Sequence, residues 1–252
     1  YGAIIYQKAP IVMRHLEKLI GPDVLREGLR EYLKDNTYGN ATWPQLITLL
    51  DSKTALNLDA WNKAWVYEAG RPRIVVTREG GDEQGPTHFV VRQEDPAGMG
   101  RIWPQKLGLL AITSKSQTMH HIELGSDAVV IPTPEGDASA PMILLPNASG
   151  IEYADFVLDP QSQKGLLRDI GSIEPPVARG AAWTTLWEEV QAGRLEAESF
   201  LTTVLRELPA EQNELIINRL LDTLDESYWL RLDARARLAV SVPLETILWR
   251  EV

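Results

Sequence analysis

The chain has 252 residues, a net charge of −10 at pH 7 and 44% hydrophobic residues, which is enough for two or three domains with buried cores. The acidic balance argues against binding to nucleic acid or to an anionic membrane surface, because both depend mainly on clustered Lys and Arg. No apolar run approaches the roughly 18 residues of a membrane span, and the absence of cysteine excludes disulfides and thiolate metal sites within this sequence.

The first part of the chain, residues 1–71, is expected to be helical, because its apolar residues recur at helical spacing. Tyr6 opens an amphipathic helix that Gly21-Pro22 ends, and a second helix follows to about Asn36. Thr42 with Gln45 three residues later is typical of a capping box. Asp59 is expected to cap a short helix that carries Trp61 and Trp65.

The middle part, residues 72–160, is expected to form an antiparallel β-sandwich, because short apolar runs alternate with turn residues. The runs are Ile74–Val76, Phe89–Val91, Leu109–Thr113, Val129–Ile131, Met142–Leu145 and Phe156–Leu158.

The last part, residues 161–252, is predicted to be helical again, with Pro209 and Pro243 between amphipathic stretches. Successive short helices of this kind favour a helical array. The sequence therefore predicts a multi-domain α and β protein: an α-helical N-terminal segment, an antiparallel β-sandwich in the middle and an α-helical array at the C-terminus.

Tyr6 is the candidate catalytic residue. A neutral phenol remains a hydrogen-bond donor at pH 7, and one donor aimed at a developing oxyanion stabilises the transition state by about 2.7–4 kcal/mol. Composition alone favours a packing role for a Tyr at a helix start. The four histidines, His15, His88, His120 and His121, lack the spacing of a zinc helix, and the sequence shows no phosphate loop or nucleophile elbow.

Several segments nevertheless share the order of a known family. They are Tyr6-Gln7-Lys8-Ala9, Gly21, Tyr32-Leu33, Tyr38-Gly39-Asn40-Ala41, Trp61 to Trp65 and Gly70-Arg71-Pro72. In this order they resemble the end of the catalytic domain of aminopeptidase N-like zinc metallopeptidases. Residues 146–159 and 179–187 resemble, more weakly, the end of that family's β-sandwich and the start of its C-terminal helical domain. This order agrees with the division into 1–71, 72–160 and 161–252.

The resemblance implies a hydrolase that cleaves N-terminal peptide bonds. In that family a H-E-x-x-H helix and a later Glu hold zinc, and a Tyr that matches Tyr6 donates a hydrogen bond to the oxyanion. The zinc ligands are absent from this sequence, and in the family they precede the Tyr. We therefore expect a fragment of a zinc aminopeptidase that contributes Tyr6, binds no zinc and is inactive alone.

The expected partners are a peptide substrate of the complete enzyme and either the missing zinc-bearing half or a second copy, because Ile11, Val12 and Leu16 would otherwise be exposed. An alternative is a scaffold for protein–protein interaction that keeps the fold without the zinc motif. An intact H-E-x-x-H in the sequence upstream would favour the enzyme. No signal peptide is visible after Tyr1, and the lack of cysteine slightly favours the cytoplasm, but a missing start leaves the compartment open.

Overall fold

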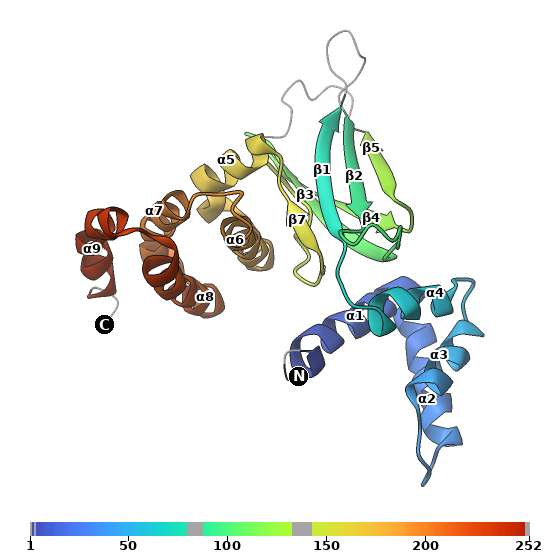
Figure 1. Ribbon diagram of the computed structural model, residues 1–252. Helices are drawn as coiled ribbons and strands as arrows, with labels where there is room; N and C mark the ends of the chain where they lie inside the picture. The colour runs from blue at the N-terminus through green and yellow to red at the C-terminus, as the bar shows by residue number, and fades with distance from the viewer. Residues whose placement is uncertain (1, 3, 80–87, 133–142, 250–252) are drawn as a thin grey trace. The chain divides into compact units, whose positions relative to one another are not determined.

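A computed structural model describes residues 2, 4–79, 88–132 and 143–249 (Figure 1). The chain forms two compact units. The first unit comprises Tyr1–Gly108, His121–Thr133 and Ile151–Asp155, and the second comprises Leu109–His120, Pro134–Gly150 and Phe156–Val252. The middle region contributes to both units, and the three-part division expected from the sequence stays a prediction. The expected turn at 134–136 and Met142 lie outside the described residues.

The first unit begins with a π-helical turn, η1 (Ile4–Lys8), that continues directly into α1 (Ala9–Ile20). Pro10 lies in the first turn of α1, directly after η1, so the helical backbone continues through a residue that has no N–H to donate. Gly21, with φ of 93°, separates α1 from α2 (Pro22–Asp35) in a conformation that a side chain would disfavour. The predicted break at Gly21-Pro22 is therefore present.

Three shorter helical segments complete this part of the first unit: α3 (Trp43–Asp51), α4 (Leu58–Asn62) and the π-helical turn η2 (Lys63–Tyr67). The side chain of Gln45 accepts the backbone N–H of Thr42 at 2.9 Å, as the capping-box motif predicts. The cap assigned to Asp59 was wrong. Asn57 caps α4, because its Oδ1 accepts the backbone N–H of Ala60 at 2.9 Å.

The core of the first unit contains two residues that were expected, from the sequence, to be exposed without a partner. Val12 and Leu16 on α1 have exposed fractions of 5% and 0%. They belong to an apolar cluster with Trp61, Trp65 and Trp103. The expectation that these two side chains would need an outside cover was wrong, because Trp103, from a distant segment, belongs to the same cluster. The burial of these side chains therefore removes the reason given for self-association, which stays an untested prediction.

The strands form two sheets. The four-stranded sheet has the order β5-β2-β1-β7, and the three-stranded sheet has the order β4-β3-β6. In the first, β1 pairs antiparallel with β2, and β2 pairs antiparallel with β5. The bounds are β1 (Arg73–Glu79), β2 (His88–Glu94), β3 (Gln105–Ile112), β4 (Gln117–Leu124), β5 (Ala128–Pro132), β6 (Ile143–Leu145) and β7 (Asp155–Val157). All six predicted runs contribute to strands, while their arrangement as a sandwich stays a prediction.

The second unit is mainly helical, with a large apolar core. Phe200, which is fully buried, lies 6.0 Å from Trp183 and 5.4 Å from Trp187 between ring centroids. Two short 3₁₀ turns, η4 (Ile170–Ser172) and η5 (Leu208–Ala210), and a π-helical turn, η6 (Ser227–Arg231), connect the helices. The helices are α5 (Pro160–Asp169), α6 (Pro176–Gln191), α7 (Ala197–Glu207), α8 (Glu214–Glu226) and α9 (Ala234–Leu248).

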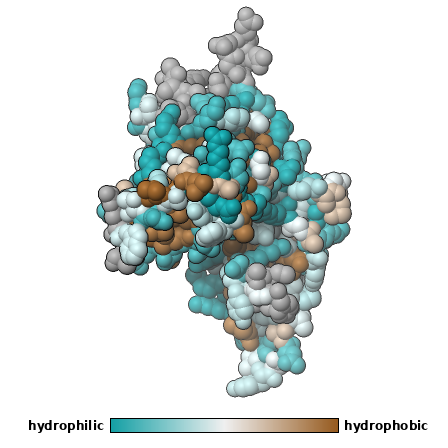
Figure 2. All heavy atoms as spheres, turned by 60° about the vertical axis from the view of Figure 1, so that its left-hand side comes forward, coloured by the Kyte–Doolittle hydropathy of each residue, from teal (hydrophilic) through white to brown (hydrophobic). Residues whose placement is uncertain are grey.

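Hydrophobic side chains also reach the surface of α8, η6 and α9. Figure 2 shows hydrophobic atoms among hydrophilic ones on the face that carries this end of the chain. Among the helices in the described ranges, none is both long enough and apolar enough to cross a membrane. The exposed large hydrophobic residues of these elements are Leu215, Leu221, Trp229, Leu230, Leu238, Val242 and Leu248.

Arg101 connects the turn after β2 to the end of the N-terminal helices within the first unit. Arg101 donates to the carboxylate of Asp95 through Nε at 2.9 Å and Nη2 at 2.8 Å, and its Nη1 donates to the carbonyl of Ala69 at 2.7 Å. Its guanidinium also lies 4.6 Å from the centroid of the Trp103 ring. These hydrogen bonds from Arg101 hold the pKa of Asp95 well below its ordinary value.

We predict that Asp95→Asn destabilises the first unit at pH 7, and that the difference from wild type narrows as the pH falls. Because the folded state lowers the pKa of Asp95, its stabilisation is present above the ordinary Asp value of about 3.9 and is lost on acidification below it. Urea unfolding between neutral and acidic pH measures this. Asp35→Asn, which removes an exposed carboxylate, is the control. A difference that stays constant with pH would contradict the prediction.

Candidate functional site

Tyr6 lies in the π-helical turn η1, with its side chain 79% exposed. The phenol is therefore not sealed within the core, and solvent reaches this side chain. π-Helical turns are rare and often occur at functional sites. The exposure is compatible with a donor that meets a substrate, while the catalytic role of Tyr6 stays a prediction.

An apolar pocket of about 220 Å³ lies next to this turn in the first unit. We call it the Lys8 pocket. Two π-helical turns contribute to it: η1 supplies Lys8, and η2 supplies Trp65 and Val66. Sequence reasoning did not identify this pocket, because its lining comes from three separate helical segments. The lining residues are Lys8, Ala9, Val12, Met13, Trp43, Trp65 and Val66.

The two indoles of the Lys8 pocket are fixed by hydrogen bonds to the protein itself. Trp65 donates its Nε1–H to the carbonyl of Pro104 at 3.2 Å. Trp43 donates its Nε1–H to Oδ1 of Asn62 at 2.8 Å. Because both donors are already used, the indoles present mainly apolar surface to the pocket.

Among the described residues, Lys8 is the only one with a charged side chain that lines this pocket. Its Nζ lies 5.7 Å from the centroid of the Tyr153 ring, which is a cation–π distance. Partial burial lowers the pKa of Lys8. In the described part of the chain, no carboxylate forms an ion pair with this ammonium. The sequence motif contains Lys8, but sequence reasoning assigned it no chemistry.

His15 has a structural place beside the pocket residue Trp65. Its ring is 1% exposed and meets the Trp65 ring edge-on, with 5.0 Å between the centroids. Burial lowers the pKa of His15, and the opposing hydrogen bond with the Ile151 carbonyl is the smaller effect. His15 is therefore expected to be neutral at pH 7, in agreement with a packing role.

The described residues do not fit a zinc site. Within the ranges 4–79, 88–132 and 143–249, no three His, Asp or Glu side chains are grouped closely enough to hold a metal ion. A catalytic zinc needs about three protein ligands. The expectation that this chain binds no zinc by itself stays a prediction that a metal assay must test.

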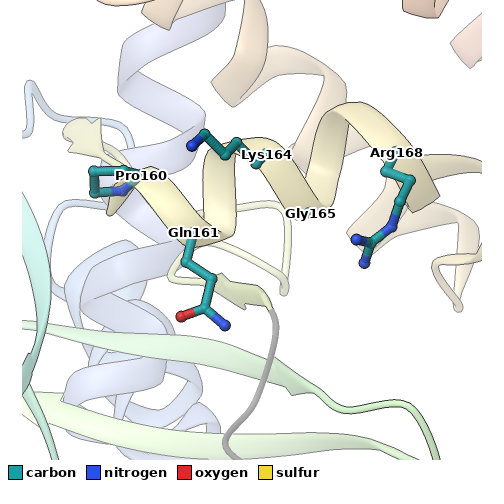
Figure 3. A pocket seen from close by; sticks show the side chains of 5 residues that line it. All are labelled: Pro160, Gln161, Lys164, Gly165 and Arg168. Atoms are coloured by element: carbon teal, nitrogen blue, oxygen red, sulfur yellow. The ribbon is translucent and has the colours of Figure 1, made fainter.

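A second pocket, of about 410 Å³, lies along α5 in the second unit. Figure 3 shows that the side chains of Lys164 and Arg168, one helical turn apart, run in different directions from this helix. Arg168 also donates through Nε and Nη2 to Asp169, at 2.9 and 2.7 Å. The basic groups therefore do not converge on one ligand position, and this pocket is the weaker candidate. Pro160, Gln161 and Gly165 complete its lining.

Comparison with known proteins adds independent evidence. The family described as "Peptidase family M1 domain" matches residues 1–65, a segment that contains Tyr6 and every lining residue of the Lys8 pocket except Val66. Aminopeptidase N of Streptomyces lividans is 26% identical over 235 residues, which are 87% of this chain and 27% of that protein. Aminopeptidase N of Lactobacillus helveticus is 25% identical over 176 residues, 69% of this chain and 20% of that protein.

A solved structure has a similar fold. Legionella pneumophila aminopeptidase A, in complex with aspartic acid, matches with a TM-score of 0.57 and 15% sequence identity. The match covers 99% of this chain and 32% of that one. At this identity the likeness concerns the fold alone.

Residues 1–65 match the M1 peptidase domain, and the fold is similar to that of a solved aminopeptidase. The chain is therefore similar to aminopeptidase N-like M1 peptidases, as the resemblance in its sequence indicated. The chain spans about a quarter of the length of the Streptomyces relative and about a fifth of the Lactobacillus one.

Proposed function

We propose that this chain is one part of a zinc-dependent aminopeptidase that hydrolyses N-terminal peptide bonds, and that Tyr6 donates a hydrogen bond to the oxyanion of the reaction. The observation that carries the proposal is the match of the M1 peptidase domain to residues 1–65, which includes Tyr6. The exposure of Tyr6 supports it, because a donor to substrate must be accessible.

The chemistry asked of Tyr6 is electrostatic. When water adds to a peptide carbonyl, negative charge develops on the carbonyl oxygen, and a fixed O–H donor stabilises that charge more than it stabilises the substrate. The hydroxyl needs no ionisation for this role, since a neutral phenol is a donor at pH 7. Zinc would supply an activated water, but its ligands would have to come from residues outside this sequence.

We predict that this chain, expressed alone, binds no stoichiometric zinc and releases no product from an aminoacyl reporter. The reason is that a catalytic zinc needs about three protein ligands and an open position, a set that the described residues do not supply. Elemental analysis and a reporter assay test the two parts separately. One zinc per chain, or reporter release above a buffer blank, would contradict the prediction.

A further inference from the structure

We propose that the Lys8 pocket binds an apolar group that carries a single carboxylate. The source of such a ligand is either a short-chain carboxylic acid or the C-terminal apolar residue of a short peptide. Binding does not require catalysis by Tyr6, so the proposal holds or fails independently of the proposed function.

The size of the pocket favours one apolar group. Its volume of about 220 Å³ exceeds that of an engineered apolar cavity of about 150 Å³ that accepts benzene. A phenyl ring or a chain of several methylenes would therefore fit. Val12, Met13 and the ring of Trp65 offer apolar contacts to it.

The polar groups of the pocket determine the chemistry of the other end of the ligand. Both indole N–H groups are bonded within the protein, to Pro104 and Asn62, so neither is free for a ligand. Within the described lining, Lys8 thus supplies the single charged donor. A partly buried ammonium that forms no ion pair with a described carboxylate favours an anion, and a carboxylate would form a charge-assisted hydrogen bond with it.

The position of Lys8 also favours binding of an anion. Tyr153 restrains the ammonium at a cation–π distance of 5.7 Å. The Lys8 side chain therefore loses less conformational entropy when a ligand binds. The lowered pKa of Lys8 reflects incomplete hydration of the ammonium. An incoming carboxylate would offset that desolvation, whereas a neutral ligand would leave it in place.

The test follows the indole N–H signals of this chain by ¹⁵N–¹H NMR during titration. We expect hexanoate to shift the signals of Trp43 and Trp65, which line the pocket, and to leave those of Trp183 and Trp187 in the second unit unchanged. Acetate lacks the apolar body and hexanol lacks the charge, so both should bind more weakly. The dipeptide Ala-Phe and its C-terminal amide form a matched pair for the peptide source. Binding of Ala-Phe but not of hexanoate would assign the site to peptides.

Three variants locate the effect. Lys8→Met removes the ammonium and keeps the apolar stem, and should raise the Kd for hexanoate about tenfold or more. Ala9→Leu fills the pocket from its exposed rim and should abolish the shifts. Lys34→Met removes an exposed lysine of α2 and should change nothing. Circular dichroism confirms folding of each variant. The proposal is overturned if neither carboxylate probe binds, or if hexanoate binds Lys8→Met and Ala9→Leu as it binds wild type.

Discussion

Replacing Tyr6 by Phe is expected to lower kcat of the proposed aminopeptidase by about 10²–10³-fold, the usual cost of removing one oxyanion donor. The substitution deletes a single oxygen from a side chain that is 79% exposed, so neither packing nor stability should change. KM and zinc content should stay close to wild type, because the lost interaction forms mainly in the transition state. Steady-state kinetics on the longer enzyme that the proposal requires, together with metal analysis and thermal unfolding, measure this.

Tyr67 provides a matched control for Tyr6. It also lies in a π-helical turn, η2, and its side chain is 62% exposed. Tyr67→Phe therefore makes the same chemical change in a similar local structure, and turnover should stay near wild type. Near-normal turnover of Tyr6→Phe, or equal losses in both variants, would remove the oxyanion role. A longer protein without an intact H-E-x-x-H motif would favour the alternative function, a scaffold for protein–protein interaction.

Local features of the fold were predictable from the sequence because their causes lie within a few residues. The capping box of Thr42 and Gln45 needs only a three-residue spacing, and the break at Gly21 needs only a residue that tolerates positive φ. The wrong assignment of the cap to Asp59 is also an error of only a few residues. Asn57 and Asp59 are both good caps two residues apart, and periodicity places a helix start no more closely than that.

The Lys8 pocket could not be predicted, because its geometry depends on contacts between distant residues. Trp65 is oriented by the carbonyl of Pro104, which is 39 residues away in the sequence. Lys8 is positioned near Tyr153, from a segment much later in the chain. The π-helical turns η1 and η2 each contain only five residues, which is too short for an apolar periodicity that differs from that of an α-helix to be recognised. For Tyr6, composition alone favoured a packing role, and the family resemblance turned the balance to catalysis.

The second large effect is expected in the second unit, where Phe200→Ala should lower the free energy of unfolding by about 3–5 kcal/mol. Phe200 is fully buried, and its ring meets Trp183 edge-on and lies tilted against Trp187. Truncation would lose these contacts and leave a cavity that two rigid indoles cannot easily fill. Urea unfolding, followed through the indole N–H signals of the two tryptophans, reports on this unit.

Leu215→Ala is the control for Phe200→Ala, because Leu215 on α8 is 80% exposed and its truncation should change stability by no more than about 0.5 kcal/mol. A second variant separates the effect of lost volume from the effect of lost aromatic contacts. Phe200→Leu keeps most of the volume but loses the aromatic edge, so its loss should be clearly smaller than that of Phe200→Ala. If Phe200→Ala costs less than about 1 kcal/mol, the surrounding helices must collapse into the space. The core around Trp183 and Trp187 would then be more adaptable than its close ring packing indicates.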